Sequence, residues 1–500
     1  MIIFNSFSYT YPGSSSPALH NIDLSLDKAD FAVITGPSGC GKSTLAHCLC
    51  SFLKEGKHTG KIFLDDKDIM NIEPFKLAEK IGLVQQDPDA QLCTLTVEDE
   101  LAFGLENLCY PVKEIQKRLD WALSVVRGQY LRYRDTLTLS GGEKQKVAIA
   151  SILAIKPEVI ILDEPTASLD PKSTAQVREA LEGLRERTET TVLILEHRIS
   201  GFLDMANKLV VMQEGEVALE GEPQEVMAKR QVLEEIGVLL PKREGKKRRE
   251  EKKTEGKLLA VKDLRCRVGD KEVIKGISFA IKKGEIAALM GDNGSGKTTL
   301  ALHILNLLKP SYGRITFLGQ DIKSRKTSEL AKSIGLVFQN PCHQLFEETV
   351  IDEILFAPRN FGMEKVEVRA ERWAGYFRLI ALLNRPPHSL SHGQKRRLNL
   401  ASILVYGPKL AILDEVFIGQ DMGNMMHIME VLEKETKKGL AVFLIAHDPN
   451  LVSRFCDRVL FLKDGRLAVD APTEEAFKEL ERIGEHAYLP RGWENTGVGH

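Results

Sequence analysis

Short apolar runs, bounded by glycine, proline or charged residues, recur along the chain and predict buried strands of a parallel sheet. Phe31–Thr35, Val159–Asp163 and Thr191–Leu195 are three such runs, and stretches of helical pattern such as Lys144–Ile155 separate them. Near the end of each half, KLVVMQEGEVALEG and RVLFLKDGRLAVDA place Glu-Gly or Asp-Gly between two alternating segments, which predicts a β-hairpin. The expected fold class is α/β.

The same landmarks occur twice in the same order. Gly36–Thr44 (GPSGCGKST) recurs 255 residues later as Gly291–Thr299 (GDNGSGKTT), and His197 recurs 250 residues later as His447. Between these landmarks lie three further matched pairs: IGLVQQDPDAQL and IGLVFQNPCHQL, LSGGEKQK and LSHGQKRR, VIILDEP and LAILDEV. A spacing that drifts by five residues over five landmarks indicates an internal duplication.

Composition narrows the class of protein. The chain has 500 residues, 43% of them hydrophobic and 28% charged, which is ordinary for a globular protein of two to four domains. Lys and Arg number 68 against 70 acids, so the basic excess of a typical nucleic-acid binder is missing. Eight cysteines without a CxxC pair argue against a disulfide framework or a zinc site. No apolar run is long enough to span a bilayer, and MIIFNSFSYTYPG does not read as a secretory leader, so we expect a cytosolic chain.

The repeat sets the expected domain boundaries: a first domain over 1–240, a second over 258–485 and a tail over 486–500. Segment 241–257 (PKREGKKRREEKKTEGK) carries nine Lys or Arg and four Glu and no large apolar residue. We interpret it as a solvated linker because it lies where two folded copies must be tethered. A patch for nucleic acid or acidic lipid is the alternative.

Each copy contains a phosphate-binding pattern. Gly36–Ser43 and Gly291–Thr298 both fit G-x-x-x-x-G-K-[ST], and each lies between a predicted strand and a predicted helix. Backbone N–H groups of such a loop converge on phosphate oxygens, the lysine reaches the β- and γ-phosphates, and the Ser or Thr hydroxyl binds Mg²⁺. The residues expected to bind nucleotide in the two loops are Gly36, Ser38, Gly39, Gly41, Lys42, Ser43, Thr44, Gly291, Asn293, Gly294, Gly296, Lys297, Thr298 and Thr299.

Two acids end a predicted strand in each copy, Asp163-Glu164 and Asp414-Glu415. Ligands of open α/β sheets gather at the carboxyl ends of strands. We expect the first acid of each pair to join the Mg²⁺ shell and the second to polarise an attacking water.

LSGGE and LSHGQ have the form of a capping box that opens a helix, with Ser140 paired to Glu143 and Ser391 to Gln394. A capped helix start also leaves free N–H groups, which favour an anion. Since each copy already has a phosphate loop, a second anion site per copy makes most sense if it completes the nucleotide site of the other copy.

With these motifs the chain resembles two ATP-binding-cassette (ABC) ATPase domains in tandem. The resemblance implies two P-loop NTPase domains, each with a RecA-like α/β core, an antiparallel β part and a helical subdomain, that use ATP and Mg²⁺. It identifies Asp163 and Asp414 as Walker B residues, Glu164 and Glu415 as catalytic glutamates, and His197 and His447 as switch histidines. Gln86 and Gln339 become the Q-loop glutamines, near both the attacking water and the metal, and Asp170 and Asp421 fall in the D-loops.

The family also implies head-to-tail pairing of the two domains around two ATP molecules. Lys42 and Glu164 would work with Ser391 and Gly393 of the other copy. The opposite site would combine Lys297 and Glu415 with Ser140, Gly141 and Gly142.

The two sites are expected to differ in strength. In such domains an aromatic residue stacks on adenine, and Tyr11 (with Tyr9 in reserve) occupies that position in the first copy, whereas the second copy has Val268. Base–aromatic stacking contributes ~1–3 kcal/mol, so we expect weaker ATP binding at the Lys297 site. His392 replaces a signature glycine, but all other catalytic positions are filled, so we expect hydrolysis at both sites.

The stretch after each Q-loop indicates the subtype. Gln91–Leu108 (QLCTLTVEDELAFGLENL) and Gln344–Asn360 (QLFEETVIDEILFAPRN) are similar to the ATPases of energy-coupling-factor importers of metal ions and vitamins. That resemblance implies membrane T and S components as partners, a peripheral place on the cytoplasmic face of the membrane and no nucleic acid. The acids offered to arginines of the T component are Glu98, Asp99, Glu100, Asp352 and Glu353. A fused ATPase of a sugar importer, or an ABC protein acting on ribosomes or nucleic acid, are the alternatives.

Overall fold

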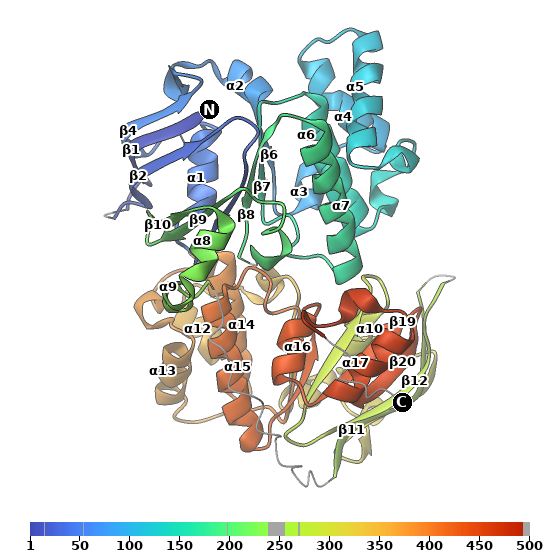
Figure 1. Ribbon diagram of the computed structural model, residues 1–500. Coiled ribbons are helices and arrows are strands. Elements are labelled where there is room, and N and C mark those ends of the chain that lie inside the picture. Colours follow the sequence, from blue (N-terminus) through green and yellow to red (C-terminus); the bar gives the residue numbers. More distant parts are fainter. Residues whose placement is uncertain (15, 54, 198, 239–255, 269–270, 494–500) are drawn as a thin grey trace. The chain divides into compact units, whose positions relative to one another are not determined.

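The computed structural model describes residues 1–14, 16–53, 55–197, 199–238, 256–268 and 271–493 (Figure 1). Most of the expected linker, 241–257, and the last seven residues lie outside the described residues. The chain forms two compact units, the first comprising Met1–Lys242 and Gln420–Asn424, the second Arg243–Gly419 and Met425–His500. Each unit contains one six-stranded and one four-stranded sheet. Within the described ranges, no helix is both long and apolar enough to cross a membrane.

The six-stranded sheet of the first unit has the order β10-β9-β3-β8-β7-β6. Its strands are parallel except for the β9–β10 hairpin. The strands are β3 (Phe31–Thr35), β6 (Ile81–Val84), β7 (Val159–Asp163), β8 (Thr191–Leu195), β9 (Lys208–Gln213) and β10 (Glu216–Gly221). The three strands expected from the apolar runs and the first expected hairpin are thus confirmed, and Glu214 and Gly215 have positive φ as a type I′ turn requires.

A smaller antiparallel sheet, β2-β1-β4-β5, completes the β structure of this unit. It consists of β1 (Ile2–Thr10), β2 (Leu19–Leu26), β4 (Lys57–Leu64) and β5 (Lys67–Asp68). The helices of the unit are α1 (Lys42–Leu49), α2 (Pro74–Lys80), α3 (Pro88–Gln91), α4 (Val97–Asn107), α5 (Val112–Val125), α6 (Gly141–Ala154), α7 (Pro171–Arg187), α8 (Pro223–Ala228) and α9 (Arg230–Ile236). Helix α6 begins three residues before the predicted Lys144, because Ser140 caps it.

The second unit repeats this plan. Its six-stranded sheet has the order β16-β17-β18-β13-β19-β20, and its four-stranded sheet the order β12-β11-β14-β15. The strands are β11 (Lys257–Val268), β12 (Lys271–Lys282), β13 (Ile286–Gly291), β14 (Tyr312–Phe317), β15 (Gln320–Asp321), β16 (Ile334–Val337), β17 (Leu410–Asp414), β18 (Ala441–Ile445), β19 (Arg458–Lys463) and β20 (Arg466–Pro472). The β19–β20 hairpin confirms the second expected one.

The helices of the second unit follow the same order. They are α10 (Lys297–Ile304), α11 (Thr327–Ala331), α12 (Val350–Asn360), α13 (Glu367–Tyr376), α14 (His392–Leu404), α15 (Met422–Lys437), α16 (Pro449–Phe455) and α17 (Thr473–Arg482), and a 3-10 turn, η9, covers His486–Tyr488. The duplication seen in the sequence is therefore a duplication of the fold.

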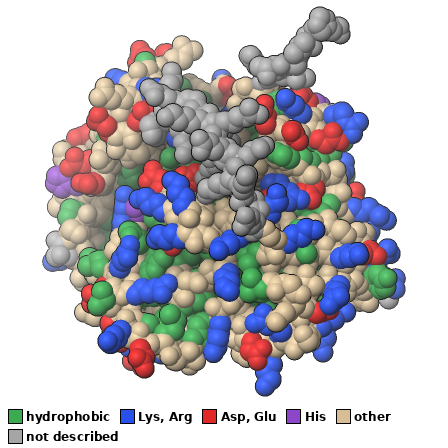
Figure 2. Space-filling view, turned by 90° about the horizontal axis from the view of Figure 1, so that it is seen from below, with side chains coloured by type: hydrophobic (Ala, Val, Ile, Leu, Met, Phe, Trp, Pro, Cys, Tyr) green, Lys and Arg blue, Asp and Glu red, His purple; other side chains and the backbone are tan. Residues whose placement is uncertain are grey.

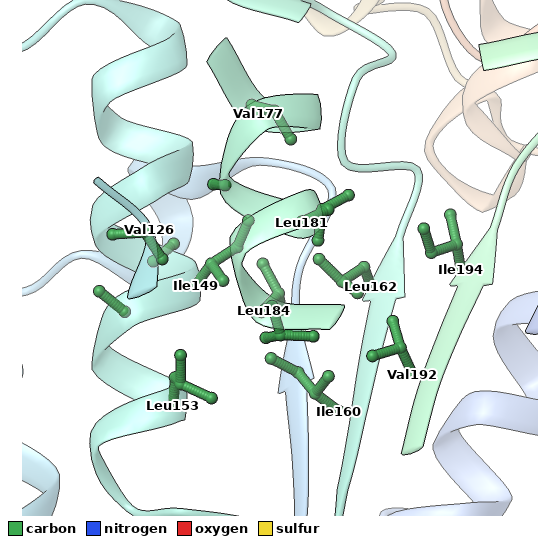
Figure 3. Close-up of a cluster of buried hydrophobic side chains, with 14 of the residues drawn as sticks. Val126, Ile149, Leu153, Ile160, Leu162, Val177, Leu181, Leu184, Val192 and Ile194 are labelled. Atoms are coloured by element: carbon green, nitrogen blue, oxygen red, sulfur yellow. The ribbon is translucent and has the colours of Figure 1, made fainter. Parts of the chain in front are cut away.

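Alternating side chains of the central strands are buried on both faces of the parallel sheet. In β7, Ile160 and Leu162 join one apolar cluster, whereas Val159 and Ile161 join another on the opposite face. Figure 3 shows Ile160 and Leu162 lying against Leu181 and Leu184 of α7. Burial on both faces explains why the strands are continuous apolar runs rather than alternating ones.

Candidate functional site

The motif residues follow the carboxyl ends of parallel strands, which meet at one edge of each sheet. In the first unit the phosphate loop follows β3, Gln86 follows β6, the acid pair ends β7 and His197 follows β8. The second unit places its motifs after β13, β16, β17 and β18. Parallel pairing therefore brings four separated motifs together in each unit.

Each phosphate loop folds around its lysine. The Nζ atom of Lys42 donates to the carbonyl oxygens of Gly36 (2.8 Å) and Pro37 (3.2 Å). In the second loop, Nζ of Lys297 donates to the carbonyl oxygens of Gly291 and Asp292, both at 2.8 Å. Both lysines are buried and open a helix, α1 or α10. A buried positive charge beside a helix N-terminus forms a site for an anion.

The first glycine of each loop is required by space as well as by conformation. Gly36 has φ +150°, and a Cβ atom there would lie 2.1 Å from the carbonyl oxygen of Met212. Gly291 has φ +144°, and its Cβ atom would lie 2.1 Å from the carbonyl oxygen of Leu462. The loop thus turns tightly against the neighbouring strand, β9 or β19, which no larger residue permits.

A glutamine and a histidine hold the second acid of the pair in each unit. In the first, Gln86 Nε2 donates to Glu164 Oε2 at 2.8 Å, and His197 Nε2 lies 2.8 Å from Glu164 Oε1. In the second, Gln339 Nε2 donates to Glu415 Oε2 at 2.7 Å, and His447 Nε2 lies 2.6 Å from Glu415 Oε1. Each glutamate is therefore fixed at both carboxylate oxygens.

The backbone at both glutamates is unusual. Glu164 has φ +47° and Glu415 has φ +51°, although neither is a glycine. Left-handed conformations of this kind are costly for residues with a Cβ atom and cluster at functional sites. The same conformation in both units directs the two carboxylates toward the glutamine and the histidine, away from the strand.

The first acid of each pair lies beside the loop hydroxyl. In the second unit, Thr298 Oγ1 donates to Asp414 Oδ2 at 2.7 Å, and the other oxygen, Oδ1, is buried and has no hydrogen-bond partner among the described residues. Burial raises the pKa of Asp414 to about 6, and the charge of Glu415 adds to this. In the first unit, burial and the charge of Glu164 raise the pKa of Asp163, and the nearby Ser43 hydroxyl opposes the rise. A carboxylate with an unused buried oxygen and an adjoining hydroxyl is a donor set that Mg²⁺ accepts.

The pKa of Glu415 is shifted in the opposite direction from that of Asp414. Burial favours its neutral form, but the hydrogen bond and charge of His447 and the charge of Lys297 outweigh burial and keep its pKa below the usual value. The acid pair of the second unit therefore combines a carboxyl with a raised pKa and one with a lowered pKa. Such a difference suits one metal ligand and one base.

Each glutamine contacts the second acid of its pair. Both donate to the glutamate. Among the described residues, no hydrogen bond joins Gln86 to Asp163 or Gln339 to Asp414. Their assignment to the metal therefore stays a prediction.

The signature motifs form the predicted capping boxes. Ser140 Oγ accepts from the Glu143 N–H, and Glu143 Oε2 accepts from the Ser140 N–H at 2.8 Å. Ser391 and Gln394 make the same pair of bonds at the start of α14. A Cβ atom on Gly142 would lie 2.7 Å from Gln176 Oε1 of α7, so this glycine allows close packing of α6. Whether these helix starts complete the site of the other copy stays a prediction.

The aromatic residues proposed for adenine are separated by the structure. Tyr11 is 39% exposed, and its hydroxyl lies 3.1 Å from Thr44 Oγ1 in the phosphate loop. Tyr9 is 2% exposed, with its ring edge-on to Tyr11 at 5.1 Å between centroids. Tyr11 is thus available to stack on adenine above the loop. The prediction that Tyr9 could take this role instead is wrong, because Tyr9 is buried in the core. Nothing is described of the Val268 side chain.

A buried acid beside the first histidine was not expected from the sequence. Glu196 is 3% exposed and accepts a hydrogen bond from Thr166 at 2.6 Å. At the matching positions the second unit has Ala446 and Phe417, so an apolar pair replaces the polar one. The sequence indicates this difference, because LEHR has Glu196 where IAHD has Ala446. A comparison of the two histidines alone does not detect it.

A buried arginine supports the second acid pair. Arg396 of α14 is 2% exposed and donates to the carbonyl oxygen of Glu415. Burial lowers its pKa to about 10. Gln145 occupies the matching position in the first unit. The Arg396 guanidinium therefore connects helix α14 to the backbone of Glu415, the residue with positive φ.

A tyrosine from the chain's last segment reaches the second phosphate loop. Tyr488 of η9 is fully buried, lies edge-on to Phe461 at 4.8 Å, and its hydroxyl donates to Asp292 Oδ1 at 2.6 Å. Asp292 is the residue whose carbonyl oxygen accepts from Lys297. Segment 486–500 gave no chemical interpretation from the sequence, because only the fold brings it to the loop.

Comparison with known proteins places these features in a family. A family model described as ABC transporter matches residues 19–167 and 274–417. A Methanosarcina acetivorans protein named "Putative ABC transporter ATP-binding protein" is 36% identical, covering 97% of this chain and 88% of its own length. A Bacillus subtilis protein named "Putative HMP/thiamine import ATP-binding protein YkoD" is 35% identical, covering 98% of this chain and 94% of its own length.

Among solved structures, cbiO1 from Clostridium perfringens, part of the ABC transporter complex cbiONQ, is 36% identical and aligns with a TM-score of 0.43. It covers 48% of this chain and 95% of its own length. The two matched family segments each run from ahead of the phosphate loop to the acid pair, in both units. The chain therefore belongs to the ABC transporter family, as an ATP-binding subunit with two ATPase domains whose hydrolysis of ATP is coupled to transport.

Proposed function

We propose that the chain powers an importer of the energy-coupling-factor type, taking up a vitamin or a metal ion, from the cytoplasmic face of the cell membrane. Its partners would be a membrane T component and a substrate-binding S component. The observation that carries the subtype is the matched run after each Q-loop, Gln91–Leu108 and Gln344–Asn360. A relative named for thiamine import, similar over 98% of this chain, supports it and makes thiamine precursors the first substrates to test.

In this proposal each unit supplies a catalytic half-site. The loop lysine binds the β- and γ-phosphates, and the glutamate, fixed by its glutamine and histidine, takes up a proton from the attacking water. The histidine ring, which contacts the glutamate through Nε2, would also sense the γ-phosphate. No covalent intermediate is needed, because positioning and electrostatic stabilisation suffice for phosphoryl transfer.

A Mg²⁺ ion would be held by the Ser43 hydroxyl and Asp163 in the first unit and by the Thr298 hydroxyl and Asp414 in the second. The unused buried Oδ1 of Asp414 fits this role. When bound, the ion neutralises charge on the β- and γ-phosphates. The same ion would also remove the cost of an ionised Asp414.

The two ATP molecules would be shared head-to-tail between the halves. The capped starts of α6 and α14 would place Ser140, Gly141 and Gly142, or Ser391 and Gly393, on the γ-phosphate of the opposite site. Two capping boxes and exposed N-terminal serines support this. We retain domains over 1–240 and 258–485, joined by 241–257.

The run after the Q-loop offers an apolar surface for a membrane partner. In each unit the run covers a loop and the helix that follows it, α4 or α12. Its exposed apolar side chains are Leu95 and Phe103 in the first unit and Phe346 and Phe356 in the second. Phe346 and Phe356 pack edge-on at 4.5 Å. Apolar side chains gathered on one surface mark an interaction site.

Two of the acids offered to a partner's arginines are needed inside the fold. Glu100 is 5% exposed and accepts from the N–H groups of Cys93 and Thr94 and from the Thr94 hydroxyl. Glu353 is 4% exposed and accepts from the N–H groups of Phe346 and Glu347. These two expectations are therefore wrong: a carboxylate that holds its own loop has no free face for an arginine.

The proposal is tested by assembly with membrane proteins. The full chain, expressed with the T and S components of an energy-coupling-factor importer from the same genome, should co-purify with them in detergent. Changing Phe103→Asp with Phe356→Asp should abolish this complex and leave the ATPase activity of the isolated chain intact. Val112→Asp with Val368→Asp, which alters exposed residues of α5 and α13, is the matched control. Co-purification with ribosomes or nucleic acid instead would contradict the proposal.

A further inference from the structure

The outward faces of the two four-stranded sheets carry different charge. In the second unit, Lys262 of β11 lies directly opposite Arg314 of β14, and Arg265 of β11 lies directly opposite Lys275 of β12. The burial pattern places these side chains on the outer face, since Val261, Leu264 and Ile274 beside them are buried. Four basic side chains thus occupy two cross-strand pairs.

Like charges directly opposite one another destabilise a sheet. Two such pairs in one small sheet oppose folding, and a natural sequence keeps a local conflict of this kind mainly where function requires it. A negatively charged partner on this face would turn the conflict into an attraction.

Acids of the second unit neutralise this face only in part. Arg265 pairs with Asp263 at 3.3 Å and Arg314 with Asp321 at 2.8 Å, on exposed surface where ion pairs contribute little. Within the described ranges, neither Lys262 nor Lys275 forms an ion pair. Further exposed basic residues are Lys282 of β12, Lys283 after it, Lys323 and Lys326 after β15, and Arg267 of β11, which has Glu272 of β12 directly opposite. Figure 2, viewed from the side on which Figure 1 draws β11, shows Lys and Arg side chains prevailing over acidic ones, with apolar side chains between them.

The first unit provides a built-in comparison. By strand register, Asn5 occupies the position of Lys262 and Lys61 that of Arg314, so the like-charge pair is missing there. His20 holds the position of Lys275, because the backbone N–H of each donates to the turn glycine of the nearby hairpin. Beside it, a hollow of about 420 Å³ is lined by His20, Asn21, Asp23, Glu216, Val217 and Glu220.

At two neighbouring positions, the second unit also lacks an acid that the first unit has. Glu216 of the first unit is replaced by Arg466 after the hairpin turn of the second. Asp65 of the β4–β5 turn is replaced by Leu318, which is 44% exposed. The difference between the faces therefore extends over several elements and is not confined to one strand pair.

The remaining side chains favour a lipid surface over a nucleic acid. Sheets that bind single-stranded nucleic acid present aromatic rings on which bases stack. The described outward positions of β11 and β12 carry none. On β14, Tyr312 is 61% exposed, with the Arg265 guanidinium 5.9 Å from its ring centroid, but one ring does not provide stacking for successive bases. Leu307 and Leu308, just before β14, and Leu318, just after it, are exposed. Basic side chains with exposed leucines at their margin suit the head-group region of an anionic bilayer.

We propose that the outer face of β12, β11 and β14 in the second unit is a docking surface for anionic phospholipid head groups. Its charge attracts the membrane without nucleotide and without the membrane proteins of the transporter. The proposal rests on the proposed function only in assuming that the chain works at a membrane. Vesicle binding and transport are separate measurements, so each can fail without the other.

The test is binding of the full chain, without nucleotide, to vesicles of phosphatidylcholine with and without phosphatidylglycerol. We expect sedimentation with the anionic vesicles only, and its loss at high salt. The variant with Lys262→Gln, Arg265→Gln, Lys275→Gln and Arg314→Gln should bind about tenfold more weakly or worse, since each basic residue near an anionic surface adds to attraction. The matched control removes four exposed charges of the first unit: Lys113→Gln, Lys117→Gln, Arg185→Gln and Lys229→Gln.

A stability measurement separates a lost surface from a damaged fold. Since the change removes two like-charge pairs, the melting temperature of the first variant should equal or exceed that of the unaltered chain. The inference is overturned if the variant binds anionic vesicles as well as the unaltered chain does, if the control variant loses binding equally, or if neutral vesicles are bound to the same extent. It is also overturned if a single-stranded RNA binds this face more tightly than the vesicles do.

Discussion

The two nucleotide sites share their chemistry and differ in how that chemistry is supported. Both units fold a loop around a buried lysine and hold a left-handed glutamate between a glutamine and a histidine. Around this common set, the first unit has Tyr11 over its loop and the second anchors its loop through Tyr488. Catalytic groups tolerate little displacement, whereas a loop can be stabilised from several directions.

The histidines show the same contrast at a smaller scale. His197 Nδ1 lies 2.9 Å from the carbonyl oxygen of Gly36 and 3.4 Å from Lys42 Nζ. Within the described ranges, His447 Nδ1 is buried and has no hydrogen-bond partner. The first histidine is thus connected to its phosphate loop as well as to its glutamate, whereas the bond described for the second joins it to its glutamate. We therefore expect the two sites to differ in ATP affinity and hydrolysis rate, while both hydrolyse ATP.

The largest expected effect is on turnover. Glu164→Gln and Glu415→Gln should each lower hydrolysis at the altered site by about 100- to 10,000-fold, because the base is removed while the side-chain volume is kept. Each single variant should keep the turnover of the other site, and the double variant should lose both. Phosphate release by the purified chain measures this. If Glu164→Gln removed all turnover while Glu415→Gln changed nothing, the two sites would not be equivalent in kind.

Nucleotide affinity comes next. The Lys42→Ala variant, which reports the second site, should bind ATP about 5- to 150-fold more weakly than the Lys297→Ala variant, which reports the first, since the sequence offers Tyr11 for adenine at the first site and Val268 at the matching position of the second. Calorimetric titration of both variants measures the difference. Adding Tyr11→Val to Lys297→Ala should remove the advantage. Equal affinities of the two lysine variants would show that adenine stacking does not separate the sites.

Removing the buried charge of Asp414 should change stability. Its pKa of about 6, against an ordinary value of 3.8, means that the folded chain binds this proton more tightly than the unfolded chain. Stability of the metal-free protein should therefore fall as the pH rises from about 4 to 6 and stay low above that. At neutral pH, Asp414→Asn should be more stable by up to about 3 kcal/mol, and the gain should vanish near pH 4.

Urea unfolding without Mg²⁺, at several pH values, measures this effect. Asp163→Asn is the matched variant of the first unit, and its stability should shift in the same direction because burial raises the pKa of Asp163 as well. An Asp414→Asn protein that is less stable at neutral pH would show that the carboxylate is stabilised by contacts that offset its burial.

The smallest expected effect concerns the last segment of the chain. Tyr488→Phe removes one buried hydrogen bond to Asp292 and keeps the ring, so ATP binding at the second site should weaken by about two- to tenfold. The first site is the internal control and should not change. Asp292→Asn keeps an acceptor and should bind nearly as the unaltered chain does. If Tyr488→Phe weakened both sites equally, the tyrosine would act on general stability and not on its loop.

The motifs were readable from the sequence because each is set by local requirements. A glycine-rich loop, an acid pair after an apolar strand and a Ser-x-x-Glu box each need particular residues at fixed spacing, and the duplication supplied an independent repetition of every one. The strands around them were readable because burial on both faces makes a parallel strand continuously apolar. Boundaries such as the start of α6 moved by a few residues, since a cap and not the apolar pattern decides where a helix begins.

Roles that depend on long-range contacts were not readable. The sequence offered Tyr11 for adenine with Tyr9 in reserve, and the fold decides between them by burying Tyr9 and exposing Tyr11. From the sequence, Glu100 and Glu353 were expected to be acids on the surface, but both are buried and accept hydrogen bonds from backbone N–H groups of their own loops. Arg396 and Tyr488 gave no signal as site residues because their partners lie at least 19 residues away in the chain.

By itself, the sequence determined that this protein is one ATPase fold written twice and which residues can handle phosphate, because those properties follow from local spacing and side-chain chemistry. The tertiary structure alone decided which acids are enclosed, which tyrosine faces the loop, and that one small sheet carries opposed basic pairs on its outer face. These depend on register and burial, and both arise only when distant segments of the chain pack together.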